Sequence, residues 1–236
     1  MDTVYLSENI VIKGGAMYHS DKLIKRHNWH IKLADLGWEK LHKIWITKLN
    51  KLHNPYPNNS LFGTLECGDD GDCLFHCISH ALNAVADDYY DAQDIRNIIA
   101  DSITQEQFNN IITCYRCMKD LDDFDESWDP YEIDTLSKFK EELQKSGHSY
   151  WGDHTILQLI MNTFNLNIFV MTQDEINDSY EPYPMANIYD PTKQTVILLH
   201  LNESHFKLLG HYNKIMMYIF DNKTVPLEIR RLFKFE

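Results

Sequence analysis

A turn-rich segment that leads directly into an amphipathic helix is the feature of the sequence that most constrains its fold. The segment is Gly68-Asp69-Asp70-Gly71-Asp72, and its glycines and aspartates are typical of a tight turn. Apolar residues then recur at helical spacing, at Leu74, Cys77, Ile78, Ala81, Leu82 and Val85. The pattern predicts a helix that begins near residue 73 and packs one face against a core.

Cys73 lies in the first turn of this predicted helix. Unpaired backbone N–H groups and the helix dipole favour a thiolate there, so we expect Cys73 to be a nucleophile. Gly71 allows the chain to turn tightly just before it. The backbone N–H groups of Asp72 and Cys73 are expected to point to where a carbonyl oxygen becomes negative, as an oxyanion hole requires. The alternative is a cysteine buried in the core.

A nucleophilic cysteine needs a base, which is usually a histidine. The chain has 12 histidines, and position distinguishes them better than number. His205 follows the strand predicted over 196–201 after a short turn, which places it at the start of a neighbouring strand. His211, which is followed by Tyr212 and Asn213, is the alternative base.

Helical and strand patterns follow one another in blocks rather than in alternation. A second amphipathic helix is predicted after Asp153, which is a suitable N-cap. Strands are predicted over 167–171, 195–201, 205–209 and 214–220. Helices that precede antiparallel strands predict an α+β domain with a small central β-sheet flanked by helices.

The first 55 residues differ from the rest in charge. They carry nine basic and five acidic side chains, a balance of +4. Because the whole chain has a net charge of −13, the remaining residues have a balance of −17. Apolar residues recur at helical spacing within 31–53, and the proline-rich segment 54–59 then stops the helix. We expect an N-terminal helical extension over 1–55 and a main domain over 56–236. The tryptophans of the extension, at 29, 38 and 45, are expected to pack it onto that domain.

Composition excludes several classes of protein. A pI near 5.3 disfavours general binding to nucleic acid or to anionic membranes. The apolar runs are too short to span a bilayer, and no secretory signal is visible. Five cysteines are an odd number, which favours reduced thiols. We expect a cytoplasmic, monomeric protein.

Three blocks of the sequence resemble the ovarian tumour (OTU) family of cysteine proteases, which cleave ubiquitin from conjugates. Asp70-Gly71-Asp72-Cys73-Leu74-Phe75-His76 is similar to the nucleophile motif of the family. Trp151-Gly152, with the helix and strand after it, is similar to the middle block. The strand over 196–201 followed by His205-Phe206 is similar to the histidine block. The resemblance covers roughly residues 60–220.

The resemblance implies an OTU-like fold, with Cys73 as nucleophile and His205 as general base. Many members orient the histidine with an Asp or Asn two residues later, but that position here is Lys207, which cannot accept a hydrogen bond. Other members use the aspartate three residues before the cysteine, so we expect Asp70 in this role. The implied partner is ubiquitin or polyubiquitin, and the reaction needs no metal or organic cofactor. The alternatives are an inert ubiquitin-binding module and a protease of a ubiquitin-like modifier.

Two further segments have weaker interpretations. Cys114 and Cys117 have the spacing of zinc or redox cysteines, but no second ligand pair follows, and we expect them to pack on a helix. The acidic run 120–129 is interrupted by Leu121, Phe124 and Trp128. A solvated loop is the default interpretation, and a contact surface for a basic partner such as ubiquitin is the alternative.

Overall fold

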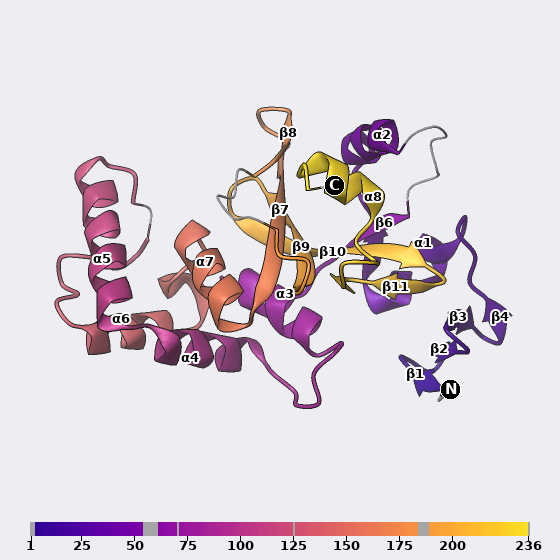
Figure 1. Cartoon of the computed structure of the whole chain (residues 1–236), viewed down its shortest axis with the longest axis horizontal. Coiled ribbons are helices and arrows are strands. Elements are labelled where there is room, and N and C mark those ends of the chain that lie inside the picture. The colour runs from indigo at the N-terminus through magenta and orange to yellow at the C-terminus, as the bar shows by residue number, and fades with distance from the viewer. Residues whose placement is uncertain (1–2, 54–60, 70, 125, 184–188, 236) are drawn as a thin grey trace. The chain divides into compact units, whose positions relative to one another are not determined.

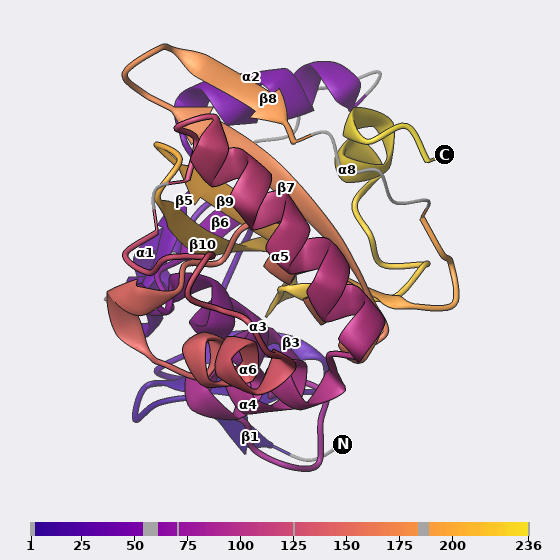
Figure 2. The same cartoon turned by 90° about the vertical axis from the view of Figure 1, so that its left-hand side faces the viewer.

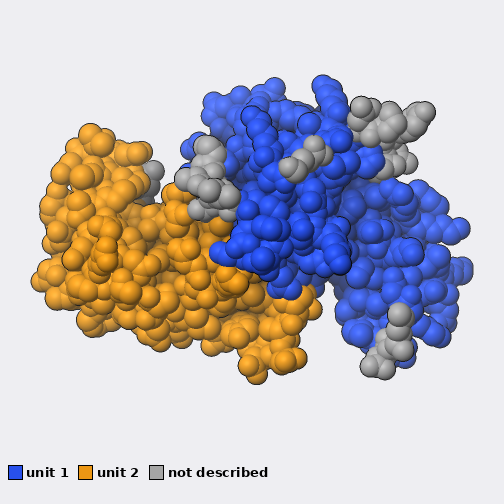
Figure 3. Space-filling view, in the orientation of Figure 1, with its two compact units in different colours: residues 1–66, 167–236 blue, residues 67–166 orange. Residues whose placement is uncertain are grey.

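A computed structural model describes residues 3–53, 61–69, 71–124, 126–183 and 189–235 of the chain. The chain forms two compact units (Figure 3). Unit 1 consists of residues 1–66 and 167–236, and unit 2 consists of residues 67–166. Unit 1 contains the main sheet and unit 2 contains most of the helices, whose labels appear in Figure 1. The predicted α+β class is confirmed.

The sheet of unit 1 has the strand order β5-β6-β10-β9-β7-β8. Two short strands extend it: β11 pairs with β10, and β12 pairs with β9. The strands predicted at the C-terminal end are confirmed, although the last one is divided into β11 and β12. The bounds are β5 Trp38–Lys40, β6 Phe62–Leu65, β7 Leu166–Asp174, β8 Ser179–Pro182, β9 Gln194–Leu201, β10 His205–Asn213, β11 Ile215–Met217 and β12 Ile219–Phe220.

Two helices supply apolar side chains to the core of unit 1. Helices α2 (Lys43–Leu52) and α8 (Leu227–Leu232) contact each other and lie side by side in Figure 1. Trp45 and Leu49 of α2 and Ile229 of α8 join a buried cluster with apolar residues of the sheet. The cluster gives one face of the sheet its cover and fixes the positions of its strands.

The first 55 residues contain strands as well as helices. Strands β1 (Val4–Tyr5), β2 (Ile10–Lys13), β3 (Ala16–His19) and β4 (Lys22–Leu23) form a separate antiparallel sheet, which the sequence patterns did not predict. Helix α1 (Trp29–Lys32) and the 3₁₀ turn η1 (Ala34–Leu36) precede β5, and the helix expected over 31–53 is α2 alone. Gly37, at φ 84°, ends η1 and lets the chain enter the main sheet as β5.

The three N-terminal tryptophans are buried, as expected. Trp29 stacks on Tyr212 of β10 with ring centroids 6.1 Å apart, and Trp45 of α2 is part of the buried cluster described above. Trp38 begins β5 and pairs with Leu65 of β6. The segment from Trp29 onward is therefore part of unit 1 rather than an appendage to it.

Unit 2 is a group of helices around α4. Helix α4 contacts α3, α6 and α7, and α5 contacts α6; Figure 2 shows α6 beside α4. Capping boxes at Asp91 and Thr104 start α4 and α5. The bounds are α3 Cys73–Leu82, α4 Ala92–Ser102, α5 Gln105–Asp120, α6 Leu136–Leu143, η2 Gly147–Ser149 and α7 His154–Thr163.

The two helices predicted around the family motifs are confirmed. Helix α3 begins at Cys73, and α7 follows Asp153, whose carboxylate accepts a hydrogen bond from the backbone N–H of Ile156 at 2.9 Å. No helix in the described part of the chain has the length and apolar character that a bilayer crossing requires.

Candidate active site

Cys73 is the first residue of α3 and is 4% exposed. Gly71 adopts φ 82°, a left-handed conformation that favours glycine, and so turns the chain sharply into the helix. Asp72 occupies the N-cap position at φ −101° and ψ 8°, but its side chain makes no capping hydrogen bond. The predicted placement of Cys73 at a helix N-terminus is confirmed, and unpaired N–H groups and the helix dipole at such a position favour a thiolate.

A second glycine lets another chain segment approach this helix. Gly152 lies so close to Leu74, the residue after Cys73, that a Cβ atom at position 152 would overlap the leucine side chain. The pair Trp151-Gly152, which the sequence marks only weakly, therefore has a packing reason within unit 2. It holds the segment before α7 against the first turn of α3.

The backbone of the turn before Cys73 is held by an internal hydrogen bond. The N–H of Asp72 donates to the carbonyl oxygen of Asp69 at 3.2 Å. This N–H, expected to contribute to an oxyanion hole, must leave that bond to receive an oxyanion. Asp70, expected to orient the base, lies outside the described residues.

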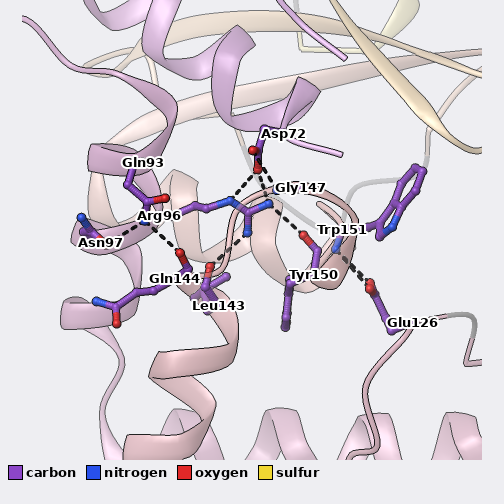
Figure 4. Close-up of polar contacts among 10 residues, drawn as sticks. All are labelled: Asp72, Gln93, Arg96, Asn97, Glu126, Leu143, Gln144, Gly147, Tyr150 and Trp151. Carbon is purple, nitrogen blue, oxygen red and sulfur yellow. Dashed lines mark hydrogen bonds and ion pairs between the residues drawn. The ribbon is translucent and has the colours of Figure 1, made fainter. Parts of the chain in front are cut away.

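The side chain of Asp72 is bound on two sides (Figure 4). Nε of Arg96 donates to Oδ1 of Asp72 at 2.7 Å, and a second guanidinium nitrogen also lies against this oxygen. The backbone N–H of Gly147 donates to Oδ2 at 2.9 Å. Asp72, the residue directly before Cys73, is therefore tied to α4 and to η2. The amphipathic pattern of α4 gave no sign that Arg96 is buried.

His205, in unit 1, is the first residue of β10 and pairs with a carboxylate. Its Nε2 lies 2.8 Å from Oε1 and 2.9 Å from Oε2 of Glu66, and the two side chains are 25% and 46% exposed. A carboxylate on one imidazole nitrogen fixes the orientation of the ring and stabilises the imidazolium. Glu66 is thus a candidate for the carboxylate that orients His205.

Strand register explains how Glu66 reaches this position. Leu208 of β10 pairs with Leu65 of β6 in an antiparallel ladder, so the next residue pair along the ladder is Lys207 and Glu66. His205 lies two residues further on the same face of β10 and is a diagonal neighbour of Glu66. Nζ of Lys207 lies 3.3 Å from Oε2 of Glu66. Glu66, His205 and Lys207 therefore form one polar cluster at the end of two adjacent strands.

Glu66 was not identified from the sequence. It follows a short apolar strand and precedes a turn, where a glutamate is an ordinary surface residue. The one available signal is its position directly before the nucleophile segment. Only the pairing of β6 with β10, which are separated by more than a hundred residues, reveals its partner.

His211, the alternative base, lies on the same strand in a different environment. Its ring packs on Phe62 with centroids 4.7 Å apart. Burial, and to a smaller degree the positive charges of Arg26 and His53, lower the pKa of His211 to about 4. A base with such a pKa takes up a proton poorly near neutral pH, which favours His205 as the base.

The structure shows where the two weaker candidates, the cysteine pair at 114 and 117 and the acidic run 120–129, place their side chains. Cys114 and Cys117 lie on α5 as expected, but both are exposed, so the expectation that they pack is wrong. The described residues contain no group of three or more His, Cys, Asp and Glu side chains that could hold a metal ion. In the acidic run, Trp128 is buried and stacks on Tyr150, while Asp129 pairs with Lys119 at 2.9 Å. Trp128 is therefore a core residue and not an anchor for a partner.

Comparison with known proteins identifies a family. Residues 68–212 match the sequence model of the family described as OTU-like cysteine protease, so the match includes both Cys73 and His205. No curated protein sequence matches the chain.

Solved structures of OTU proteins are distant relatives. An OTU deubiquitinase from Wolbachia pipientis wMel is 15% identical, covers 76% of this chain and 99% of its own, and has a TM-score of 0.43. An OTU domain in complex with ubiquitin is 17% identical over 73% of this chain and 81% of its own, with a TM-score of 0.43. The Hazara virus OTU bound to ubiquitin is 13% identical over 66% and 87%, with a TM-score of 0.41.

Proposed function

Because the chain belongs to the OTU-like cysteine protease family, we propose that it is a deubiquitinating enzyme that cleaves isopeptide bonds after the C-terminus of ubiquitin. The observation that carries the proposal is the position of Cys73 at the start of α3, directly after a left-handed glycine. Helix N-termini stabilise thiolates, so this position suits a nucleophile. Ubiquitin is the substrate that membership of the family implies.

The proposed reaction has two halves. In the first, the thiolate of Cys73 adds to the carbonyl carbon of the isopeptide bond, and the carbonyl electron pair moves to oxygen. The intermediate collapses, the C–N bond breaks, and the leaving lysine amine takes a proton from the imidazolium of His205. In the second half, His205 removes a proton from water, which adds to the thioester, and the thiol of Cys73 leaves.

We assign the oxyanion to the backbone N–H groups of Cys73 and Asp72. These groups belong to the turn and to the first residue of α3, where the helix dipole favours negative charge. The N–H of Asp72 would exchange the carbonyl oxygen of Asp69 for the oxyanion, and the 3.2 Å length of the present bond makes this exchange modest in cost.

Glu66 supplies the orienting carboxylate in this proposal. Glu66 contacts Nε2 of His205, and we assign Nδ1 of the same ring to the exchange of protons with the thiol and the leaving group. Lys207 pairs with the same carboxylate and so helps to keep Glu66 in place. The lysine at the position where many members have an Asp or Asn is then compatible with activity. Asp70 remains a second candidate for the orienting role.

A linkage panel of purified di-ubiquitins tests the proposed function. Wild-type protein should cleave at least one linkage, and Cys73→Ala should cleave none. Cleavage of a fusion to a ubiquitin-like modifier, without cleavage of any ubiquitin substrate, would assign the other modifier as substrate. Binding of ubiquitin without cleavage of either substrate would show an inert module and overturn the proposal.

A further inference from the structure

Arg96 is a fully buried arginine whose contacts converge on the nucleophile segment. Its side chain has no measurable exposure. Besides its bonds to Asp72, it donates to the carbonyl oxygens of Leu143 and Tyr150 at 3.0 and 2.9 Å (Figure 4). Its guanidinium also lies 3.9 Å from the centroid of the Phe75 ring. Arg96 therefore contacts the chain on both sides of Cys73, at residues 72 and 75.

Such an arrangement is costly unless it has a definite partner. Burial lowers the pKa of Arg96 from its ordinary value, and the hydrogen bond and charge of Asp72 oppose this shift. A guanidinium ion taken out of water needs a counter-ion and a full set of acceptors, and Asp72 with the two carbonyl groups provides them. Packing alone does not require a charged residue at position 96 of α4, because an apolar side chain would also fill the space. The buried charge of Arg96 is instead matched to a specific partner, Asp72.

The direction in which Asp72 points has a consequence for Cys73. An aspartate at an N-cap ordinarily accepts hydrogen bonds from the first turn of its helix, but the Asp72 carboxylate makes no such bond. Arg96 and the N–H of Gly147 hold it instead. An unpaired carboxylate at the start of α3 would repel both the thiolate and the oxyanion. The contact with Arg96 neutralises the charge of the Asp72 carboxylate and fixes its position.

We propose that Arg96 is a positioning residue that fixes the turn before Cys73 through the carboxylate of Asp72. This inference rests on the proposed function, in which Cys73 is the nucleophile and the backbone N–H groups of residues 72 and 73 hold the oxyanion. The Gly147 N–H completes the clamp by fixing the second carboxylate oxygen. Both the orientation of the thiol and that of the oxyanion donors depend on this clamp.

The test separates positioning from stability. Asp72→Ala should lower kcat about 100-fold, as misplacement of catalytic groups by about 1 Å does, with KM changed less than about threefold. Asp72→Asn keeps an oxygen that can accept a hydrogen bond from Arg96. It should therefore retain most of the kcat that Asp72→Ala loses. The control is Gln93→Ala, because Gln93 lies on α4 one turn from Arg96 and donates to the carbonyl of Gln144 without touching Asp72. Rates are counted per site titrated with a ubiquitin electrophile.

A double variant removes the unpaired charge that Asp72→Ala leaves behind. Asp72→Ala with Arg96→Met should recover melting temperature relative to Asp72→Ala, since no buried ion lacks a partner, while kcat stays low. If kcat per titrated site recovers together with melting temperature, Arg96 has only a structural role and the proposal is overturned. If Asp72→Ala does not fold, Arg96→Lys replaces it, because lysine lacks the fork that reaches all three partners; unchanged kcat in that variant overturns the proposal.

Hydrogen exchange makes this result independent of ubiquitin cleavage. Amides in the peptide from residue 71 to residue 76 should exchange faster in Asp72→Ala than in wild type, while those of Gln93→Ala should not. Faster exchange in a protein that never cleaves ubiquitin would refute the proposed function and leave the clamp standing. Unchanged exchange would overturn the clamp itself.

Discussion

The carboxylate of Glu66 lies 2.8 and 2.9 Å from Nε2 of His205; His205 begins β10, and Glu66 directly follows β6, the adjacent strand of the same sheet. The contact gives the proposed base an acidic partner that neither Lys207 nor any residue next to His205 in sequence could supply. It places the orienting group of the proposed triad at the end of β6, seven residues before the nucleophile in sequence.

Glu66→Gln should lower kcat strongly with little change in KM. The glutamine keeps the size of the side chain but removes the charge that stabilises the imidazolium, and such changes lower kcat by about 10²- to 10⁴-fold. Steady-state cleavage of a di-ubiquitin measures this effect. Glu39→Gln, an exposed glutamate on the neighbouring strand β5, is the matched control. Equal rates for Glu66→Gln and wild type would return the orienting role to Asp70.

A second carboxylate on the same strand face should rescue the loss. In Glu66→Gln, the further change Lys207→Asp places an acid two residues after His205 on the same face of β10, where many family members have an Asp or Asn. We expect at least about a tenfold recovery of kcat. The single variant Lys207→Asp is measured beside it. A double variant no faster than Glu66→Gln would mean that position 207 cannot reach the imidazole.

Local patterns were sufficient to predict Cys73 but not Glu66. The turn, the glycine and the apolar stripe of α3 lie within about fifteen consecutive residues, so their spacing specifies the helix start directly. The role of Glu66 depends on the pairing of Leu65 with Leu208, which no local pattern records. Sequence could therefore indicate Cys73 and His205 as candidates for the nucleophile and the base, but not the acid that pairs with His205.

Charge and strand length explain why the sequence patterns did not predict the burial of Arg96 or the strands β1 to β4. Arg96 lies on an amphipathic helix, where a charged residue is normally assigned to the solvent face, and its burial follows from Asp72 in a distant segment. Strands β1 to β4 have only two to four residues each, too few for a recognisable alternation. The overall α+β class was predictable because longer patterns, such as α7 and β9, decide it.

Acid should weaken unit 1 through two histidines. Burial lowers the pKa of His200 and of His211 to about 4, with smaller contributions from neighbouring positive groups. In the unfolded chain both titrate near 6.5, so unfolding takes up protons between pH 6.5 and 4, and stability is lost as the pH falls through that window. We expect a loss on the order of 1–2 kcal/mol per histidine at pH 5.

Denaturant unfolding at pH 7 and pH 5 measures this loss. His211→Gln should unfold with a smaller difference between the two pH values than wild type, because one of the two titrating groups is gone. His19→Gln changes a partly buried histidine at the end of β3 and is the control. An identical pH dependence in His211→Gln and wild type would contradict a buried neutral His211.

Glu126 should have the opposite effect in unit 2. Burial raises its pKa to about 7, although the backbone N–H of Trp151, at 3.1 Å, favours the charged form. In the unfolded chain the group ionises near 4.5, so unfolding releases a proton between pH 4.5 and 7 and stability falls as the pH rises. Glu126→Gln should therefore stabilise the protein at pH 8, on the order of 1 kcal/mol, and leave it unchanged at pH 4. Thermal unfolding at the two pH values measures this, and destabilisation at pH 8 would contradict it.

Covalent labelling by ubiquitin that carries a C-terminal electrophile tests the central claim most directly. The wild-type chain should gain the mass of one ubiquitin at Cys73, and His205→Ala should react far more slowly. Cys73→Ala should not react, whereas Cys114→Ala, which removes an exposed cysteine on α5, should react like wild type. Undiminished labelling of Cys73→Ala, or no labelling of the wild-type chain, would contradict the assignment of Cys73 as the nucleophile of a deubiquitinating enzyme.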